Sequence, residues 1–560
     1  MAIVRQLPVS FQTSFSNSTS YPENLIHRGT STYPTALKAY RKRLDDVSPK
    51  LLLHSETHAE VPIIDLCSEL GNKIQGRYVN TTAKLTSVLG IESRPNPAAA
   101  TQNDIVATKR DPKCRFIYFY GPHSRARLRA TRDILSQILT CHQVMPAYLD
   151  FMFVFGSQSE PRDLRFSGFR EQTALWDPPR GQAVTDLGRS GRQYQLCYNL
   201  KCVTLKAKNE EDPSLTEWSI RQAAIHHQFD VVYGTTLWIV TTGHSDLENR
   251  FRELTGKDGR PEDKSFDTLE ECFRSSLSAH LLYCHWSTEE WRWYIGWIEE
   301  VMDEKTFGAV FSPTHRQYKP HHIQDLQQWE DKTNEVIMVL EANVEVMRSL
   351  RDFYTAIFKK RDFPNALKDE CMDDLHGFAA QIDSMIYDLR MQIARAVLFV
   401  KITNDRKELV KTHLQTQATE RMERLNRNME REAIVMRIIT FVTLIYLPAT
   451  FVSTFFSTDI IKYQSQTGDA PGEGTFSKAA MNRWIQVTLP LTVLTLLFAW
   501  SFLKLSERWR TNQESPRAIP KQQPAKATSG SPTGGLLPTY LRYKKAQLGV
   551  SIREKTFWKV

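Results

Sequence analysis

The sequence predicts an α+β domain in the N-terminal half, followed by a long stalk helix and a two-helix transmembrane hairpin. Three observations lead to this fold class. Residues 438–456 are nineteen residues without a charge, and residues 484–503 form a second apolar run. At about 1.5 Å of rise per residue, each run matches the ~30 Å hydrocarbon core of a bilayer. Residues 365–447 hold no proline and one glycine, and strand-like runs concentrate between residues 113 and 243.

The part of the chain before the stalk divides into two predicted regions. Residues 1–110 are expected to be a partly disordered N-terminal segment, because Pro, Ser and Thr are frequent there. Residues 111–310 are expected to form an α/β cytoplasmic domain. Strands are predicted at 114–120, at 194–206 and, as two runs broken near Gly234, at 219–243. A helix is predicted at 134–144, and 151–156 is predicted to be a buried strand or an apolar segment.

Residues 311–433 are predicted to form a helical arm and stalk that runs directly into the first span, residues 434–456. Apolar residues recur there at steps of three and four, which is typical of a helix with one continuous packing seam, as in a coiled coil. The seam consists of Leu375, Phe378, Ile382, Met385, Leu389, Ile393, Ala396 and Val400. Beyond Val400 the apolar seam thins and charged residues dominate, so we expect the part of the stalk between Val400 and the first span to be exposed.

The distribution of charge predicts the orientation in the membrane. Residues 504–560 contain twelve Lys or Arg and three Asp or Glu, so this tail carries the whole net charge of +9. We expect it to be a mostly disordered cytoplasmic tail facing anionic lipid. Five arginines between positions 421 and 437 precede the uncharged run 438–456, whereas the connecting loop, 457–483, balances three basic against three acidic residues. The positive-inside rule therefore predicts a multi-pass membrane protein with both termini cytoplasmic and an external loop.

The sequence lacks the motifs that several functional classes require. The neutral remainder of the chain has no basic, aromatic-interleaved patch, so no nucleic-acid partner is expected. The eight cysteines contain no CxxC pair, which favours buried, reduced thiols. His226 and His227 are adjacent in a predicted strand and would point to opposite faces, which favours a structural role. No nucleophile–base set or phosphate-binding Gly loop is present, so we expect no enzyme.

The first span carries hydroxyl side chains on one face. Thr443, Thr450 and Ser457 are seven residues apart, and Ser453 and Thr454 lie close to the same line. Hydroxyl oxygens can hydrogen-bond hydrated cations, which favours a pore-lining stripe. The alternative is that these groups bond their own i−4 carbonyls or join helices. Pro448 lies mid-span and is expected to be a hinge, or a kink without a conducting role.

The segment YLPATFVSTFFSTD, residues 446–459, resembles the first span of the CorA magnesium channel family. That span runs from an xPLTF-like element into a Gly-Met-Asn signature. Pro448, Thr450 and Phe451 match the element, whereas the signature positions hold different residues: Ser457, Thr458 and Asp459. The layout of stalk and hairpin over residues 320–505 is similar to the same family. The runs at 142–151, 221–234 and 291–300 are similar to a divergent, fungal group of CorA-like membrane proteins.

The resemblance implies a homopentamer in the lipid bilayer, in which the first spans line a pore for Mg²⁺ or a related divalent cation. It implies no covalently bound cofactor. Ser457, Thr458 and Asp459 would stand at the mouth of the pore, and five copies of Asp459 would form an acidic ring that holds the metal. The alternative is that Asp459 ends the helix in water. Since the signature is lost, a non-conducting scaffold or sensor that keeps the fold stays the alternative function.

Overall fold

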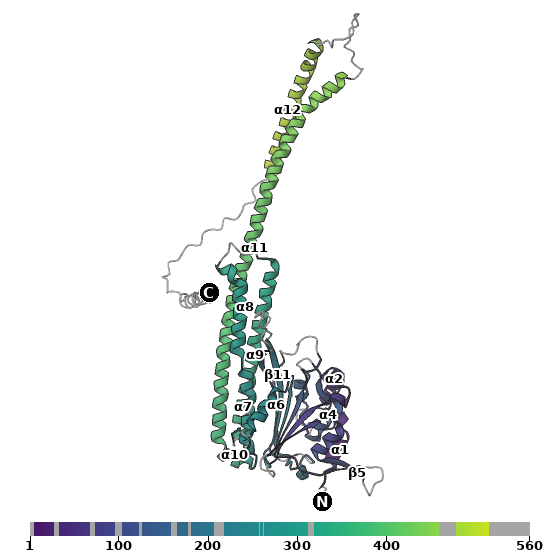
Figure 1. The fold of residues 1–560 in the computed structure, drawn as a ribbon, viewed down its shortest axis with the longest axis vertical. Coiled ribbons are helices and arrows are strands. Elements are labelled where there is room, and N and C mark those ends of the chain that lie inside the picture. Colours follow the sequence, from purple (N-terminus) through teal and green to yellow (C-terminus); the bar gives the residue numbers. More distant parts are fainter. Residues whose placement is uncertain are drawn as a thin grey trace, which may run out of the picture. The chain divides into compact units, whose positions relative to one another are not determined.

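The computed structural model describes residues 5–26, 33–67, 73–95, 103–122, 126–157, 165–176, 178, 181–205, 218–256, 258–260, 263–311, 318–457 and 478–513. The chain forms two compact units, Met1–Glu420 and Arg421–Val560. The first unit contains the sheet and most of the helices, and the second contains the end of one long helix and the last helix (Figure 1).

The first unit is built on a seven-stranded mixed sheet in the order β4-β3-β7-β12-β11-β10-β9. Neighbouring strands are antiparallel except β7 and β12, which are parallel. The strands are β3 (Val61–Cys67), β4 (Lys73–Val79), β7 (Cys114–Tyr120), β9 (Phe169–Ala174), β10 (Gln193–Leu205), β11 (Trp218–Asp230) and β12 (Thr236–Thr242). The strands predicted from the sequence at 114–120, 194–206 and 219–243 are β7, β10 and the β11–β12 pair.

The N-terminal part of the chain covers one face of this sheet. Its helices are α1 (Val9–Ser16), α2 (Pro34–Leu51), α3 (Thr82–Leu89), α4 (Arg132–Cys141) and α5 (Tyr148–Met152). Two smaller sheets join β1 (Arg5–Gln6), β5 (Ile91–Pro95) and β6 (Asn103–Ala107), and β2 (Leu52–Leu53) with β8 (Leu128–Thr131). Short 3-10 turns occupy Ser18–Ser20, Glu56–His58 and Thr185–Leu187. Residues 151–156 are therefore the end of α5 and a turn, and not a strand.

The boundary expected at residues 110 and 111 falls inside this folded unit. Strands β3 and β4 come before it and β7 after it, yet all three are neighbours in one sheet. The residues of β3 and β7 read as typical buried strands, but their pairing joins parts of the chain about fifty residues apart. The sequence patterns predicted β7 but not β3 or β4, and they do not reveal that these strands share a sheet.

A layer of long helices covers the opposite face of the sheet (Figure 1). These are α6 (Asp246–Leu254), α7 (Leu269–Thr288), α8 (Trp291–Phe311), α9 (Pro320–Lys359), α10 (Asn365–Glu370) and the first part of α11 (Met372–Ser457). Thr268 starts α7 with a capping box, in which Thr268 Oγ1 accepts from Glu271 N at 3.2 Å and the Glu271 carboxylate accepts in return. Pro364 separates α9 from α10.

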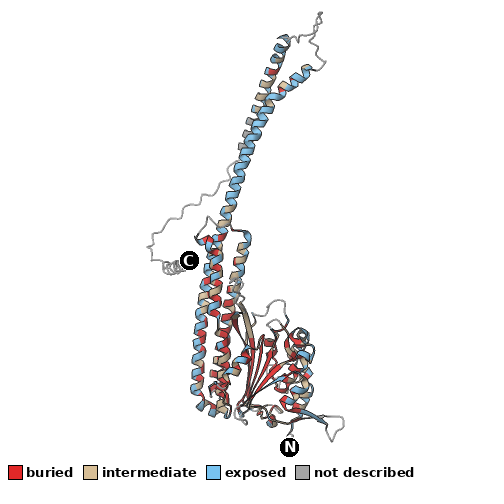
Figure 2. Ribbon diagram, in the orientation of Figure 1, coloured by how far each residue is buried: buried red, intermediate tan, exposed pale blue. Residues whose placement is uncertain are grey.

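Side chains alternate between the two faces, so the sheet serves two cores. The strands of the sheet are coloured mostly as buried (Figure 2). In β7, Phe116 and Tyr118 pack with the long helices, whereas Ile117 and Phe119 pack with α4 and α5. The predicted stalk seam from Leu375 to Val400 lies against the first of these cores and is buried or half-buried throughout. The α+β fold class with a long helix and a C-terminal apolar helix, α12 (Lys478–Gln513), is thus confirmed.

An asparagine closes the part of β10 that β9 leaves open. β9 pairs with β10 only as far as Tyr198, so the peptide groups beyond it lack a strand partner on that side. Asn343 of α9, fully buried, accepts from Lys201 N at 3.0 Å and donates to Lys201 O at 2.7 Å. A side-chain amide thus replaces one rung of the missing strand, because it carries the same donor and acceptor as a peptide group.

We predict that Asn343→Ala lowers the free energy of unfolding by about 2–5 kcal/mol, since it leaves the N–H and C=O of Lys201 buried and unpaired. The measurement is the urea midpoint of the full-length protein in detergent. Asn334→Ala, at an exposed position of the same helix, is the matched control and is expected to change stability by less than about 0.5 kcal/mol. Equal effects of the two variants would contradict this role for Asn343.

Candidate functional site

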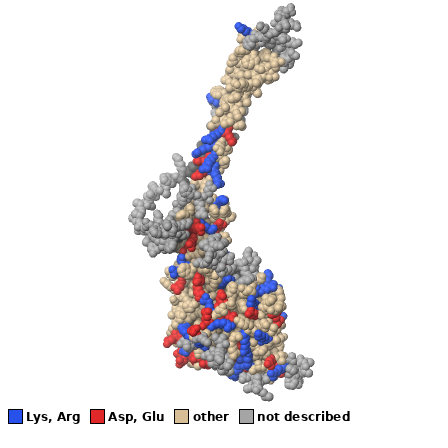
Figure 3. Space-filling view, in the orientation of Figure 1, with Lys and Arg blue, Asp and Glu red and all other residues tan. Residues whose placement is uncertain are grey.

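Two helices are long and apolar enough to cross a membrane. They are the last part of α11, which ends at Ser457, and residues Met481–Ser501 of α12. Only 6% of each apolar window is buried, in contrast to the core of the first unit (Figure 2). A soluble helix would bury such a surface, whereas a helix in lipid need not. The uncharged part of the two helices forms one continuous surface without Lys, Arg, Asp or Glu (Figure 3).

The predicted hydroxyl stripe lies on the side of α11 that faces away from α12. Among the described side chains of α11 from residue 421 onward and of α12, the buried ones are Pro448, Val452 and Thr488, which mark the line of contact. Thr450 is two residues from both Pro448 and Val452 and, at about 100° per residue, lies about half a turn away from them. Thr443, Thr450 and Ser457 are all exposed. The hairpin therefore leaves the stripe uncovered.

The hydroxyl groups of the stripe donate to carbonyls of their own helix. Thr443 Oγ1 donates to Ile439 O at 3.0 Å, and Thr450 Oγ1 donates to Tyr446 O at 3.0 Å. Thr454 and Ser457 do the same at 2.7 and 2.9 Å. Because each hydroxyl hydrogen is used inside the helix, the oxygen lone pairs remain as acceptors on the exposed face. A hydrated cation presents water hydrogens outward, and such acceptors match them.

Ser453 differs from the rest of the predicted pore-lining set. Its Oγ accepts a hydrogen bond from Trp484 Nε1 of α12 at 3.1 Å. This bond joins the two helices near the end of α11, which is the helix-joining role that the sequence left as an alternative. Pro448 lies in the contact with α12, and α11 continues through it as helix to Ser457. The pore-lining role of these residues stays a prediction.

The mouth of the candidate pore lies at the end of what the structure describes. Ser457 is the last described residue of α11, and Thr458 and Asp459 lie outside the described residues, as does the loop to residue 477. The acidic ring expected from Asp459 therefore stays a prediction. At the other end of the span, basic and acidic side chains gather on α11 just before the uncharged surface begins (Figure 3). These include Arg421, Arg424, Arg427, Arg431 and Arg437, all exposed.

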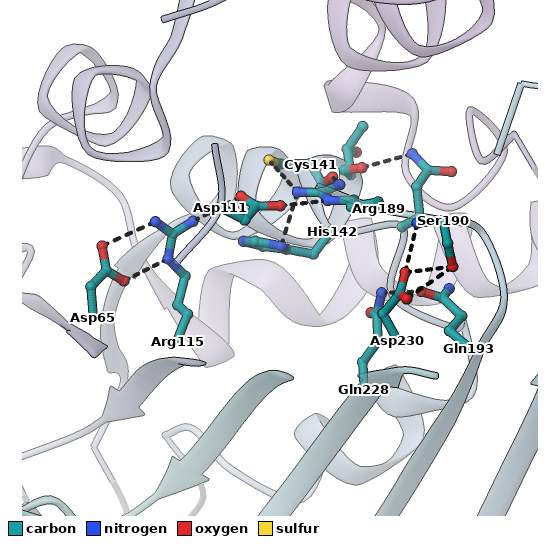
Figure 4. A network of polar contacts seen from close by, with 12 residues as sticks. Asp65, Asp111, Arg115, Cys141, His142, Arg189, Ser190, Gln193, Gln228 and Asp230 are labelled. Carbon is teal, nitrogen blue, oxygen red and sulfur yellow. Dashed lines mark hydrogen bonds and ion pairs between the residues drawn. The ribbon is translucent and has the colours of Figure 1, made fainter. Parts of the chain in front are cut away.

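A buried polar network in the first unit was not predicted from the sequence (Figure 4). Arg115 of β7 forms a two-bonded ion pair with Asp65 of β3, at 2.7 and 3.1 Å, and lies 3.6 Å from Asp111. Asp111 in turn accepts from Arg189 Nε at 2.6 Å. Burial alone would lower the pKa of both guanidinium groups, but the neighbouring carboxylates raise it, so both stay charged. In the sequence, the only indication of this network is Arg115, a single arginine within the aromatic strand 114–120.

The same network contains His142, whose tautomer follows from its partner. Arg189 can only donate, so His142 Nδ1, 3.3 Å from Arg189 Nη2, accepts, and the hydrogen of the neutral ring lies on Nε2. Burial, Arg189 and Arg115 all lower the pKa of this histidine. A cavity of about 30 Å³ lined by Asp111, Arg115, His142 and Gln228 has space for about two water molecules. Each guanidinium group of the network pairs with a carboxylate, Arg115 with Asp65 and Arg189 with Asp111, so we interpret the network as structural.

The histidines of β11 are buried on opposite faces of the sheet. His226 packs against Tyr148, and His227 stacks on Trp238 with ring centroids 4.0 Å apart. His227 Nδ1 also lies 3.2 Å from His280 Nε2 of α7. Burial lowers the pKa of His226 and His280 to about 3. Across the described parts of the chain, no three His, Cys, Asp or Glu side chains gather as a metal site would require.

Comparison with known protein families matches residues 13–310 to the model for CorA-like transporters. No curated protein matches the sequence. Among solved structures, full-length CmaX is similar at 10% identity and a TM-score of 0.29, over 81% of this chain and 98% of its own. The ZntB cytoplasmic domain from Vibrio parahaemolyticus is similar at 10% identity and a TM-score of 0.30, over 63% of this chain and 99% of its own. At these scores neither structure supports a functional argument.

The family match falls on the N-terminal domain, whereas the resemblance of the first span was drawn from residues 446–459. The two observations use different parts of the chain and lead to the same family. The match describes the family as a whole and gives no support to a narrower, fungal placement.

We predict that acid destabilises the first unit through its buried histidines. In the unfolded chain a histidine titrates near pH 6.5, whereas the folded pKa of His226 and His280 is about 3. Between these values only the unfolded state binds the protons. Stability is therefore complete above about pH 6.5 and falls as the pH is lowered, by about 1.4 kcal/mol per pH unit for each histidine.

The measurement is the urea midpoint of the full-length protein between pH 7.5 and 5, followed by tryptophan fluorescence. His226→Leu removes one titrating group and places an apolar side chain at the same buried position. This variant is expected to show a shallower pH dependence. His376→Gln, at an exposed position of α11, is the control. An unchanged slope in His226→Leu would show that another group causes the loss of stability.

Proposed function

Because this chain belongs to the CorA-like transporters, we propose that it conducts a divalent metal cation, Mg²⁺ or a related ion, through a pore lined by its first membrane helix. The family consists of membrane transporters and not of enzymes, in agreement with the absence of catalytic motifs from the sequence. Its members typically oligomerise. The finer statements that follow, on the ion, the pore and the number of subunits, are parts of the proposal.

The observation that carries the proposal is the position of the hydroxyl stripe. Thr443, Thr450 and Ser457 stand on the face of α11 that α12 leaves uncovered, with their oxygens available as acceptors. In a ring of copies this face would point to the axis, with α12 on the outside. Mg²⁺ loses its hydration shell reluctantly, so a pore that bonds the shell's hydrogens suits it better than one that must strip the water.

Asp459 is proposed to complete the pore at its outer mouth. Five carboxylates around an axis attract divalent cations more strongly than the five amides that the Gly-Met-Asn signature supplies. Ser457 and Thr458 replace the other two signature residues, and we propose that their hydroxyls take part in the same mouth. Both termini and the basic tail are proposed to lie in the cytoplasm, where arginines before the span and lysines after it face anionic lipid.

A second candidate function is a membrane-anchored scaffold or sensor that keeps the fold without conducting. The observation that favours it is the replacement of all three signature residues by Ser457, Thr458 and Asp459. Loss of the glycine removes backbone freedom at the mouth, and a charged ring binds cations strongly enough to slow their release. Only the channel function predicts flux of divalent cations across the membrane, so a flux measurement distinguishes the two functions.

The test is uptake of Mg²⁺ and Co²⁺ into liposomes containing the purified protein and an enclosed fluorescent indicator. We expect flux in the wild type and a loss of at least about tenfold in Asp459→Lys, since a ring of ammonium groups repels the ion. Asp459→Asn restores the amide of the family signature and is the matched control, expected to keep most of the flux. Absence of flux for every divalent ion, with the oligomer intact, would decide for the scaffold or sensor.

A further inference from the structure

Trp484 of α12 donates a hydrogen bond across the hairpin. Its indole N–H bonds Ser453 Oγ of α11 at 3.1 Å. Trp484 and Trp500 stand close to the two ends of the apolar part of α12, Met481–Ser501. Tryptophans at such positions lie at the two boundaries of a bilayer core, where their N–H groups bond water or headgroups. The N–H of Trp484 is instead used by the neighbouring helix.

Trp484 is held at both its backbone and its side chain. Thr488, one of the buried residues on the line of contact, donates from Oγ1 to Trp484 O at 2.7 Å. The indole then reaches Ser453 on the other helix. Thr450, in contrast, bonds the carbonyl of Tyr446 in its own helix. Ser453 is thus the hydroxyl of α11 that links the helix to α12.

Ser453 lies on the flank of α11, between the line of contact and the hydroxyl stripe. It is about 100° from Val452 on the line of contact and about 60° from Thr450 in the stripe, since each residue turns the helix by about 100°. A hydrogen bond at this angle resists rotation of α11 about its own axis, because rotation lengthens and bends the bond. The apolar contact at Pro448 and Val452 is non-directional and resists rotation less.

The rotation of α11 decides which side chains lie on the face opposite α12. In the structure this face carries Thr443 and Thr450, both exposed. Phe451 is the next residue along the chain and is 65% exposed. A rotation of about 100° would therefore place its ring where Thr450 stands. Phenylalanine offers no acceptor to the water around a hydrated cation, and apolar constrictions in pores exclude water.

We propose that Trp484 is a positioning residue of the second span. Through Ser453 it fixes the rotation of α11, so that the hydroxyl stripe and not Phe451 faces the axis of the pore. This proposal rests on the pore function given above. Trp484 does not contact the ion in this role and acts only through the bond to Ser453. The other role open to Trp484 is that of a boundary anchor, which requires no bond to α11.

The test is a disulfide inside the hairpin that reports the rotation of α11 and does not depend on flux. In the full-length protein in liposomes, Thr488→Cys is combined either with Val452→Cys or with Phe451→Cys, and mild oxidant is added. The seven native cysteines that the structure describes are buried, so the wild type supplies the background. We expect disulfide formation at least about tenfold faster in the Val452→Cys pair, because Phe451 points about 100° away from the line of contact.

Trp484→Phe removes the N–H and keeps an aromatic ring, and we expect it to lower this preference at least about fivefold. Ser453→Ala removes the acceptor and is expected to have the same effect, and the two changes together no more than either alone, since they break one bond. Ser453→Thr keeps the hydroxyl and should retain the preference. Trp500→Phe is the matched control, because the ring of Trp500 contacts Lys504 of its own helix. An unchanged preference in Trp484→Phe would overturn the proposal and leave Trp484 as an anchor.

Divalent flux separates this proposal from the pore function. Where both hold, Trp484→Phe and Ser453→Ala lower the flux of Mg²⁺ or Co²⁺ at least about fivefold, whereas Ser453→Thr and Trp500→Phe keep it. A wild type without flux, in which Trp484→Phe still abolishes the disulfide preference, would support the positioning of α11 by Trp484 and overturn the pore function. Full flux in Trp484→Phe, with the preference lost, would overturn the link between this bond and the pore.

Discussion

The fixed rotation of about 100° per residue along α11 is the constraint on which the rest of this structure depends. One helix of 86 residues must present suitable side chains to a protein core, to water and to lipid in succession. In the first unit, the seam from Leu375 to Val400 packs against the neighbouring helices. In the second unit, the face with Pro448 and Val452 meets α12, and the opposite face carries hydroxyls. Which residue can perform which function follows from its angular position on this helix.

The second constraint is the desolvation of buried polar groups in the first unit, each of which needs a hydrogen-bond or ion-pair partner. Asn343 replaces a missing strand because the peptide groups of Lys201 would otherwise lose water without gaining a partner. The ion pair of Arg115 with Asp65 follows the same logic, since a buried guanidinium without a carboxylate would be far less stable. The buried histidines stay neutral for the same reason. These groups hold the sheet and its helices together.

The chemistry of the proposed pore differs from that of the signature it resembles. Amide groups at the mouth hold a hydrated ion by neutral hydrogen bonds, whereas Asp459 would add full negative charge. In the proposed pore, the hydroxyl oxygens along the span would be weaker acceptors and would leave the hydration shell in place. Strong attraction at the mouth favours entry of the ion but slows its release. Weak binding along the pore lets the ion pass. The balance between the two decides whether the chain conducts or only binds.

The sequence by itself determined the elements whose signals are local. The uncharged runs, the seam of α11 and the strands of β7, β10, β11 and β12 all follow from periodicity and composition, as does the face on which Thr443 and Thr450 lie. Only the tertiary structure decided which elements meet. It paired β3 with β7 across the expected domain boundary, and it placed residues 151–156, expected as a strand or an apolar segment, at the end of α5 and in a turn. It also joined Ser453 to Trp484 and Asn343 to Lys201. The physical reason is that side-chain periodicity depends on neighbours along the chain, whereas pairing and desolvation depend on residues far apart in sequence.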